Sequence, residues 1–336
     1  MDSFDVIIIG AGPAGLKCAE TLGETKLKVL LIDKKKTIGP KICAGGLTAL
    51  DSHFKVPIEK TLSFETQHVI LNGKETEFSL ENPLLTIDRY DLGQFQLKLV
   101  KKFKNIKIKT NVLVKEINKN YILTNEGKKY NFKTLIGADG STSLVRKYLG
   151  LESKIYLGIQ YIIPIKHDKL VWFLSPKLLT SGYGWIFPHK NFTSAGVFFN
   201  PKHIPSKNAK EALNKFLDDY GIDYSNATFE GSPTNCLFKG FQFNNIFLAG
   251  DAAGLVSADT GEGISYALAS GFDVAKHIID DNSQFDNVKK ILKYKRRQEF
   301  LLWIFDRIPV SYIQTLMFKL FLKSMRHPKF QHYFGN

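Results

Sequence analysis

The sequence predicts an α/β protein in which a mostly parallel sheet comes first, a lobe of antiparallel strands follows and helices close the chain. A glycine-rich turn at residues 10–15 separates a strand from a helix, as at the start of a βαβ unit. Aromatic-rich stretches between 155 and 235 have the length and spacing of strands. Apolar residues in 310–325 recur at the i, i+3, i+4 spacing of a helix face.

The expected elements group into three parts. A first, discontinuous domain takes residues 1–60, 86–152 and 236–285, a β-sheet domain takes 61–85 and 153–235, and a short helical region takes 286–336. The elements are a strand at 5–9, a helix at 13–22, a strand at 28–32, a hairpin at 60–87 with its turn at Asn72 and Gly73, a helix at 91–102, strands at 106–110, 112–118, 120–124 and 132–137, a helix at 207–220, a strand at 245–249 and a helix ending near 279.

Composition indicates a globular protein, with 44% apolar residues and 12 prolines in 336 residues. Three cysteines at unrelated spacings predict neither a disulfide framework nor a metal site, and they suit a reducing cytosol. Residues 6–9 are too short for the apolar run of a signal peptide, and no stretch reaches 18 apolar residues. We therefore expect a cytoplasmic chain without a membrane-spanning helix.

The net charge of +14 is concentrated near the C-terminal end, where residues 287–336 contain 11 Lys and Arg against two acids. An anionic membrane, a nucleic acid or solvent alone would suit such a face. We expect a monomer that contacts the inner face of a membrane peripherally and binds no nucleic acid. In the alternative, the apolar faces of this tail close the second lobe. The tail spans 289–329, and its basic cluster is Lys289, Lys290, Lys293, Lys295, Arg296 and Arg297, followed by an apolar run at 300–305 and a helix face of Ile313, Leu316, Met317, Leu320 and Phe321.

The first motif is GAGPAG at 10–15. Gly10 permits a tight turn, Gly12 lets a pyrophosphate approach the backbone, and Gly15 allows close packing of helix on strand. An acid at the end of the second strand binds ribose hydroxyls, which favours FAD or NAD over NADP. The candidate contacts are Gly10, Gly12, Pro13, Ala14, Gly15, Asp33 and Lys34.

Two later motifs follow buried strands. LIGADGSTSLVR at 135–146 brings backbone at Asp139 and Gly140 close to a cofactor and opens a helix with Ser143 and Arg146, although alone it also fits a turn with a helix cap. In the segment 246–271, Asp251 is positioned to accept a ribityl hydroxyl, and the next glycines open a helix whose N–H groups face a flavin. The candidates in this segment are Gly250, Asp251, Gly261, Glu262, Gly263 and Ile264.

The order of GAGPAG, TIDRYDL, GADGSTSLVR and GDAAG…TGEG resembles the p-hydroxybenzoate-hydroxylase-like flavoproteins. KICAGGL (41–47) and YGWIFP (183–188) further resemble the geranylgeranyl reductase family. The resemblance implies a Rossmann-type FAD-binding domain of the glutathione-reductase and p-hydroxybenzoate-hydroxylase-like kind, an antiparallel β-sheet substrate domain and a helical C-terminal region. It also implies further cofactor contacts at Lys41, Cys43, Ala44, Gly45, Arg89, Val114 and Arg146.

Cys43 lies in a loop before Gly45, so a thiol next to the flavin either donates a proton or only shapes the loop. Tyr183, Trp185 and Phe187 alternate along one strand and therefore share a face, which forms either the core of the lobe or the wall of an apolar pocket. We favour the pocket, with Cys43, Tyr183 and Trp185 as candidate catalytic residues. His189 and Lys190 are expected to face solvent.

The resemblance implies a reductase that saturates carbon–carbon double bonds of a polyprenyl lipid with hydride from reduced FAD. The alternatives are an aromatic monooxygenase or flavin halogenase with the same fold, and a non-catalytic flavin-bound lipid carrier or electron-transfer protein. Only one dinucleotide fingerprint is present, so either NAD(P)H binds without its own Rossmann site or reduced ferredoxin supplies the electrons.

Overall fold

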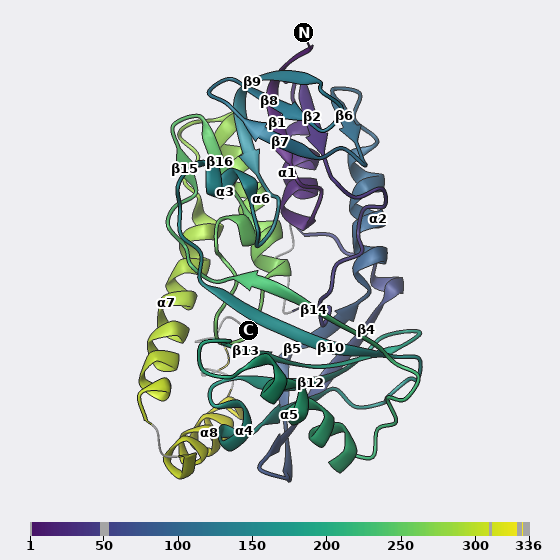
Figure 1. Ribbon diagram of the computed structural model, residues 1–336, viewed down its shortest axis with the longest axis vertical. Helices are drawn as coiled ribbons and strands as arrows, with labels where there is room; N and C mark the ends of the chain where they lie inside the picture. Colours follow the sequence, from purple (N-terminus) through teal and green to yellow (C-terminus); the bar gives the residue numbers. More distant parts are fainter. Residues whose placement is uncertain (1, 48–53, 309–310, 328–330, 332–336) are drawn as a thin grey trace.

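Two eight-stranded sheets form two lobes, which lie one above the other in Figure 1. The computed structural model describes residues 2–47, 54–308, 311–327 and 331. The first residues of the chain lie in the upper lobe, and most of the segment from 155 to 235 lies in the lower lobe.

The first sheet is parallel at its centre. Strand β1 (Asp2–Ile9) pairs in parallel with β2 (Val29–Ile32) on one side and with β9 (Lys129–Gly137) on the other. Strands β1 and β2 carry buried, unbroken apolar runs, which is typical of parallel strands covered on both faces. The remaining strands of this sheet are β6 (Ile106–Lys109), β7 (Val114–Ile117), β8 (Tyr121–Thr124), β15 (Gln242–Phe243) and β16 (Ile246–Leu248).

Three helices pack together against this sheet. Helix α1 (Pro13–Gly23) lies in contact with both α2 (Arg89–Val100) and α6 (Ile264–Ile279). The carboxyl ends of the central strands point toward the lower lobe (Figure 1), and ligands of open parallel sheets bind beyond such ends. The space between the two sheets is therefore where a nucleotide is expected.

The second sheet has the order β14-β10-β13-β12-β11-β4-β5-β3. The prediction of a purely antiparallel sheet is wrong at one place, because β4 and β11 run parallel. Strand β4 comes from an early segment, and its hairpin with β5 turns at Asn72 and Gly73 as expected, both with positive φ. The strands are β3 (Gly46–Leu47), β4 (Thr61–Leu71), β5 (Lys74–Ile87), β10 (Ile155–Ile163), β11 (Val171–Leu174), β12 (Tyr183–Pro188), β13 (Thr193–Phe199) and β14 (Thr228–Asn235).

The chain closes with two long helices that extend beside the lobes. Helix α7 (Asp286–Asp306) packs on α6 and descends along one side of the molecule to α8 (Ser311–Met325) in the lower lobe (Figure 1). Among the described residues, no helix is long and apolar enough to cross a membrane. The shorter helices are α3 (Leu144–Tyr148), α4 (Pro176–Leu179) and α5 (Ser206–Asp219), with 3₁₀ turns η1 (Ile58–Lys60) and η2 (Gly250–Ala252).

Two expectations for the tail change with the structure. Lys295 is 3% exposed, and its ammonium donates to the carbonyl of Val256 at 2.7 Å and pairs with Glu299, so it does not belong to a basic surface. The predicted face of α8 is largely exposed, because a different face of this helix turns inward. Positions 310 and 329, at the limits of the predicted helix and tail, lie outside the described residues.

Candidate functional site

The glycine turn between β1 and α1 gives each of its three glycines a different constraint. A Cβ at Gly10, whose φ is +102°, would lie 2.2 Å from the carbonyl oxygen of Ala138, and a Cβ at Gly15 would lie 1.9 Å from that of Gly10. A Cβ at Gly12 would meet no protein atom within 4 Å, because that position faces a cavity. Gly10 and Gly15 are thus needed for packing, and Gly12 keeps space open.

Helix α1 begins at this cavity, which Gly12, Pro13 and Ala14 line. Its N-cap is Gly12, with Pro13 at the first helical position and no side-chain cap from the described residues. A helix N-terminus of this kind carries a partial positive charge and free donors, and it binds phosphate.

The carboxylate of Asp33 holds the end of β2 against the glycine turn. One oxygen accepts a hydrogen bond from the backbone N–H of Ala11 at 2.7 Å, and the other accepts one from that of Lys35 at 2.7 Å. The side chain also lines the cavity, so it shapes the glycine turn and faces the space beside it.

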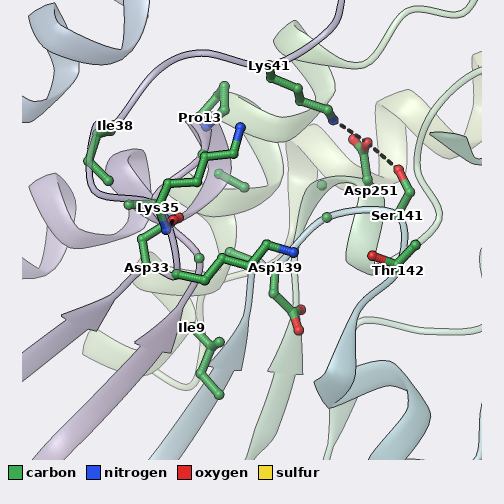
Figure 2. A pocket seen from close by; sticks show the side chains of 18 of the residues that line it. Ile9, Pro13, Asp33, Lys35, Ile38, Lys41, Asp139, Ser141, Thr142 and Asp251 are labelled. Atoms are coloured by element: carbon green, nitrogen blue, oxygen red, sulfur yellow. Dashed lines mark hydrogen bonds and ion pairs between the residues drawn. The ribbon is translucent and has the colours of Figure 1, made fainter. Parts of the chain in front are cut away.

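The first cavity has a volume of about 440 Å³ and lies at the carboxyl ends of the central strands. Many of the residues predicted to contact the cofactor line it, and Figure 2 shows several of their side chains. The predicted residues on its wall are Gly10, Gly12, Pro13, Ala14, Asp33, Lys34, Lys41, Arg89, Val114, Asp139, Gly140, Gly250 and Asp251. Others on the wall were not predicted, among them Lys35, Ile38, Gly39, Pro40, Ser141 and Pro233.

An ion pair lies on the wall of this cavity. The ammonium of Lys41 lies 2.7 Å from a carboxylate oxygen of Asp251, and the hydroxyl of Ser141 donates to the same oxygen at 3.0 Å (Figure 2). Burial alone would raise the pKa of Asp251, but the charge of Lys41 and these two hydrogen bonds lower it below its ordinary value. Asp251 is therefore held as a carboxylate, with Lys41 and Asp251 on the walls of both cavities.

Arg89, at the start of α2, also lines both cavities. Its side chain is buried, and its Nε has no hydrogen-bond partner among the described residues. A buried, unpartnered guanidinium nitrogen is costly unless another group accepts from it. Together with the open position at Gly12 and the uncapped start of α1, this fits an anionic dinucleotide in the first cavity.

The second cavity, of about 340 Å³, is mostly apolar and belongs largely to the lower lobe. Tyr183, Trp185 and Phe187 of β12 all line it, so the alternating side chains form a cavity wall. The ring of Trp172 packs edge-on against that of Phe187 at 4.9 Å between centroids. The rest of the wall includes Cys43, Ala44 and Gly45 from the loop after β2, Gly261, Glu262, Gly263 and Ile264 before α6, and Phe318, Phe321, Leu322 and Met325 of α8.

Two predicted cofactor contacts line neither cavity. Gly15 packs under the glycine turn. Arg146 is 1% exposed, and its guanidinium donates to the backbone carbonyls of Glu152, Leu237 and Ala252. Its charge is thus used to join three segments of the chain.

The expectation that His189 faces solvent is wrong, whereas Lys190 is exposed as expected. The imidazole of His189 lies 2.9 Å through Nε2 from the carbonyl of Ala44, and its Nδ1 is buried without a partner among the described residues. Burial lowers the pKa of His189, which keeps the ring neutral near pH 7. Because the ring backs the loop that carries Cys43, it fixes that part of the cavity wall.

A comparison with known proteins can now be set beside this geometry. The family model of pyridine nucleotide-disulphide oxidoreductases matches residues 4–160. Digeranylgeranylglycerophospholipid reductase 3 of Methanosphaera stadtmanae is 31% identical over 298 residues, which cover 80% of this chain and 75% of that protein. The chain belongs to the geranylgeranyl reductase family.

Solved structures show the same fold. A geranylgeranyl bacteriochlorophyll reductase-like protein from Thermoplasma acidophilum has a TM-score of 0.79 at 19% identity, with 97% of this chain and 92% of that chain covered. The halogenase PltM has a TM-score of 0.73 at 15% identity, with 96% and 80% covered, and shares the fold alone. As a member of the geranylgeranyl reductase family, the chain is an FAD-dependent oxidoreductase.

Proposed function

We propose that this flavoenzyme reduces carbon–carbon double bonds in a polyprenyl lipid of the geranylgeranyl type. The observation that supports this most directly is the junction of the two cavities. The first cavity meets the mostly apolar second cavity at Lys41, Arg89 and Asp251, so an apolar chain in the second cavity would reach the ring of a flavin bound in the first. The relative from Methanosphaera stadtmanae carries the name of such a reductase.

FAD would extend along the first cavity, with its diphosphate at the start of α1 and its adenosine ribose at Asp33. When bound and reduced, the flavin supplies a hydride to one carbon of the double bond. The protein binds and orients the alkene and excludes water from it.

Within the second cavity, we assign contacts with the alkene to Cys43, Tyr183 and Trp185. The hydroxyl of Tyr183 donates to the carbonyl of Thr260 at 2.5 Å, and the indole of Trp185 donates to Ser194 at 2.9 Å, so both rings are held in place. Rigid aromatic walls order a flexible isoprenoid chain at little further entropic cost.

Both NAD(P)H and reduced ferredoxin remain candidate electron donors, since one dinucleotide fingerprint serves FAD. Each donor predicts a different result with oxidised enzyme. Rapid bleaching of the flavin by NADH or NADPH alone would identify a nicotinamide nucleotide as the electron donor. Bleaching only by reduced ferredoxin would assign it to the iron–sulfur carrier.

The function is tested by anaerobic reoxidation of the flavin. Enzyme reduced with dithionite is mixed with a digeranylgeranyl lipid, and flavin absorbance and lipid mass are followed together. We expect the flavin to reoxidise as the lipid gains two hydrogens per double bond. Reoxidation that requires oxygen and yields a hydroxylated product would point to a monooxygenase. If the lipid does not reoxidise the flavin at all, the result would favour a non-catalytic lipid carrier or electron-transfer protein.

We further propose that the enzyme works as a monomer docked on an anionic membrane through α7 and α8. Large apolar side chains are exposed along these two helices, with Tyr312 at 77% and Leu320 at 57%. The other face of α8 lines the second cavity through Phe318 and Leu322. Helix α8 would thus lie between the second cavity and a lipid that leaves the bilayer at this surface.

A further inference from the structure

The loop between η2 and α6 carries an acid that the proposed function does not yet use. Asp259 lies on the wall of the second cavity. Tyr183 of β12 and Glu262, which follows Asp259 in the same loop, line this cavity as well. No hydrogen bond or ion pair joins its carboxyl group to any of the described residues. An ionisable group without a partner in a mostly apolar cavity costs stability, and such groups concentrate where they do chemistry.

The backbone around Asp259 is fixed, in contrast to its free carboxyl group. The hydroxyl of Ser257 accepts from the N–H groups of Asp259 and Thr260, both at 3.3 Å, and donates to Gln298 of α7 at 3.0 Å. Lys295 of α7 donates to the carbonyl of Val256 at 2.7 Å. The loop is thus anchored on both sides of Asp259, which holds the carboxyl group at a defined place on the wall.

We infer that the carboxyl group of Asp259 is the proton donor for alkene reduction. This inference rests on the proposed function. The hydride bonds to one alkene carbon, and the electron pair of the π bond takes the proton of Asp259 at the other carbon. The product is a saturated C–C unit and a carboxylate, which regains its proton from water.

Tyr183 and Cys43, which lie on the same cavity wall, fit this role less well. The hydroxyl of Tyr183 already donates its proton to the carbonyl of Thr260. A thiol is ordinarily a weaker acid than a carboxyl group by about four to five pKa units. Because an alkene carbon is a poor base, the stronger acid is the better donor.

The surroundings of Asp259 keep the acid protonated closer to neutral pH. Burial and the negative charge of Asp306, at the end of α7, raise the pKa of Asp259 to about 6. Tyr183 of β12 and Tyr266 of α6 also interact with Asp259, and both are neutral at that pH. The acid therefore stays stronger than a thiol and still carries a proton in a useful fraction of molecules.

The test compares four enzymes reduced with dithionite and mixed anaerobically with a digeranylgeranyl lipid: wild type, Asp259→Asn, Asp259→Glu and the exposed control Asp168→Asn. We expect Asp259→Asn to slow flavin reoxidation at least about 100-fold, Asp259→Glu to recover part of the rate, and Asp168→Asn to match wild type. The wild-type rate should fall as pH rises above about 6, and this dependence should be absent in Asp259→Asn. Infrared spectra of the oxidised proteins give a second readout, in which a protonated-carboxyl band that titrates near pH 6 disappears in Asp259→Asn.

Failure of the proton donor differs from failure of the proposed function. If no prenyl lipid reoxidises wild-type flavin, the proposed function is wrong. If wild type reacts and Asp259→Asn stays within threefold of it, Asp259 is not the donor. A large loss in Cys43→Ser with none in Asp259→Asn would move the role to the thiol.

Discussion

At the level of single residues, the three glycines of the first turn separate folding from cofactor binding. Gly10 and Gly15 have no room for a side chain because backbone atoms approach within 2.2 Å of the added carbon. A side chain at Gly12 would meet no protein atom near its Cβ, and only a bound group would occupy the same space. Substitutions at Gly12 and Gly15 therefore have different expected outcomes.

Gly12→Val is expected to leave the fold intact and remove most of the FAD, since the new side chain would occupy the place of the diphosphate. Gly15→Ala serves as the contrast, because its Cβ would press on the carbonyl of Gly10 and destabilise the protein itself. Flavin absorbance per protein and the urea midpoint measure the two effects. Full FAD occupancy in folded Gly12→Val would contradict the phosphate site.

Asp259→Asn should stabilise the flavin-free protein at high pH. The pKa of Asp259 is raised from 3.8 to about 6 in the fold, so the native state binds this proton more tightly than the unfolded chain. Its charge therefore destabilises the fold above about pH 6, and the penalty fades as pH falls from 6 to 4. The full shift corresponds to at most about 3 kcal/mol.

Urea unfolding of wild type and Asp259→Asn at pH 8 and pH 4 measures this effect. The variant should gain stability at pH 8 and match wild type at pH 4, because asparagine resembles the neutral acid. An equal difference at both pH values would mean that the carboxyl group keeps its ordinary pKa in the fold.

The sequence analysis identified residues whose role is local, but it did not predict side-chain interactions between distant segments. The glycines and Asp33 lie within one βαβ unit, so their spacing carries the information. Lys41 and Asp251 were both identified, but their ion pair joins positions 210 residues apart. His189 was expected in solvent because nothing nearby in the sequence signals the carbonyl of Ala44.

At the level of elements, the short helix α3 connects several segments of the chain through hydrogen bonds. Ser143 caps it by accepting from the N–H of Arg146 at 2.9 Å, and Asp139 accepts from the N–H of Leu144 at 2.6 Å. Burial raises the pKa of Asp139, while hydrogen bonds from the hydroxyl of Ser143 and the N–H of Leu144 lower it again in part. The side chain of Arg146 then reaches from this helix to carbonyls near β14 and in η2.

Arg146→Met is expected to lose about 2–4 kcal/mol of stability, because the buried carbonyl of Ala252 and the carbonyls of Glu152 and Leu237 lose their donor. FAD content at low temperature should stay near that of wild type. The neighbouring exposed variant Lys147→Met is the control and should change neither quantity. Loss of FAD at unchanged stability would instead support the direct cofactor contact that the family resemblance implies.

Helix α8 shows why the periodicity of an element does not determine which face is buried. The predicted stripe includes Ile313, Leu316 and Leu320, and all three are exposed, whereas Leu322 and Met325 are buried. An apolar stripe on one helix does not reveal whether the partner is protein or lipid. Both faces of α8 are apolar, which is compatible with a helix between a cavity and a membrane.

At the level of the whole molecule, segments that lie far apart in the sequence meet at the junction of the two cavities. The loop after β2, the start of α2 and the η2 turn supply Lys41, Arg89 and Asp251. The fold class could be predicted from the order of motifs along the sequence. The parallel β4–β11 pair could not, because sequence alternation does not fix strand direction.

The same whole-molecule arrangement makes membrane docking testable by vesicle co-sedimentation. Exposed apolar side chains on α7 and α8, including Phe300 and Trp303, lie among basic residues, and Arg307 stacks on the ring of Trp303 at 3.8 Å. Each basic side chain near an anionic surface contributes about 1 kcal/mol. Binding should therefore require anionic lipid and fade as salt shortens the Debye length from about 30 to about 3 Å.

Charge reversal then identifies the docking face. The double variant Arg296→Glu and Lys319→Glu, at exposed positions of α7 and α8, should weaken vesicle binding at least tenfold at low salt and keep its FAD. The matched control Lys101→Glu and Lys102→Glu makes the same net charge change beyond α2, in the other lobe, and should weaken binding much less. Equal losses in the two double variants would mean that binding follows net charge alone. Wild-type protein that stays in the supernatant with anionic vesicles at low salt would identify α8 as a wall of the substrate cavity and not a membrane anchor.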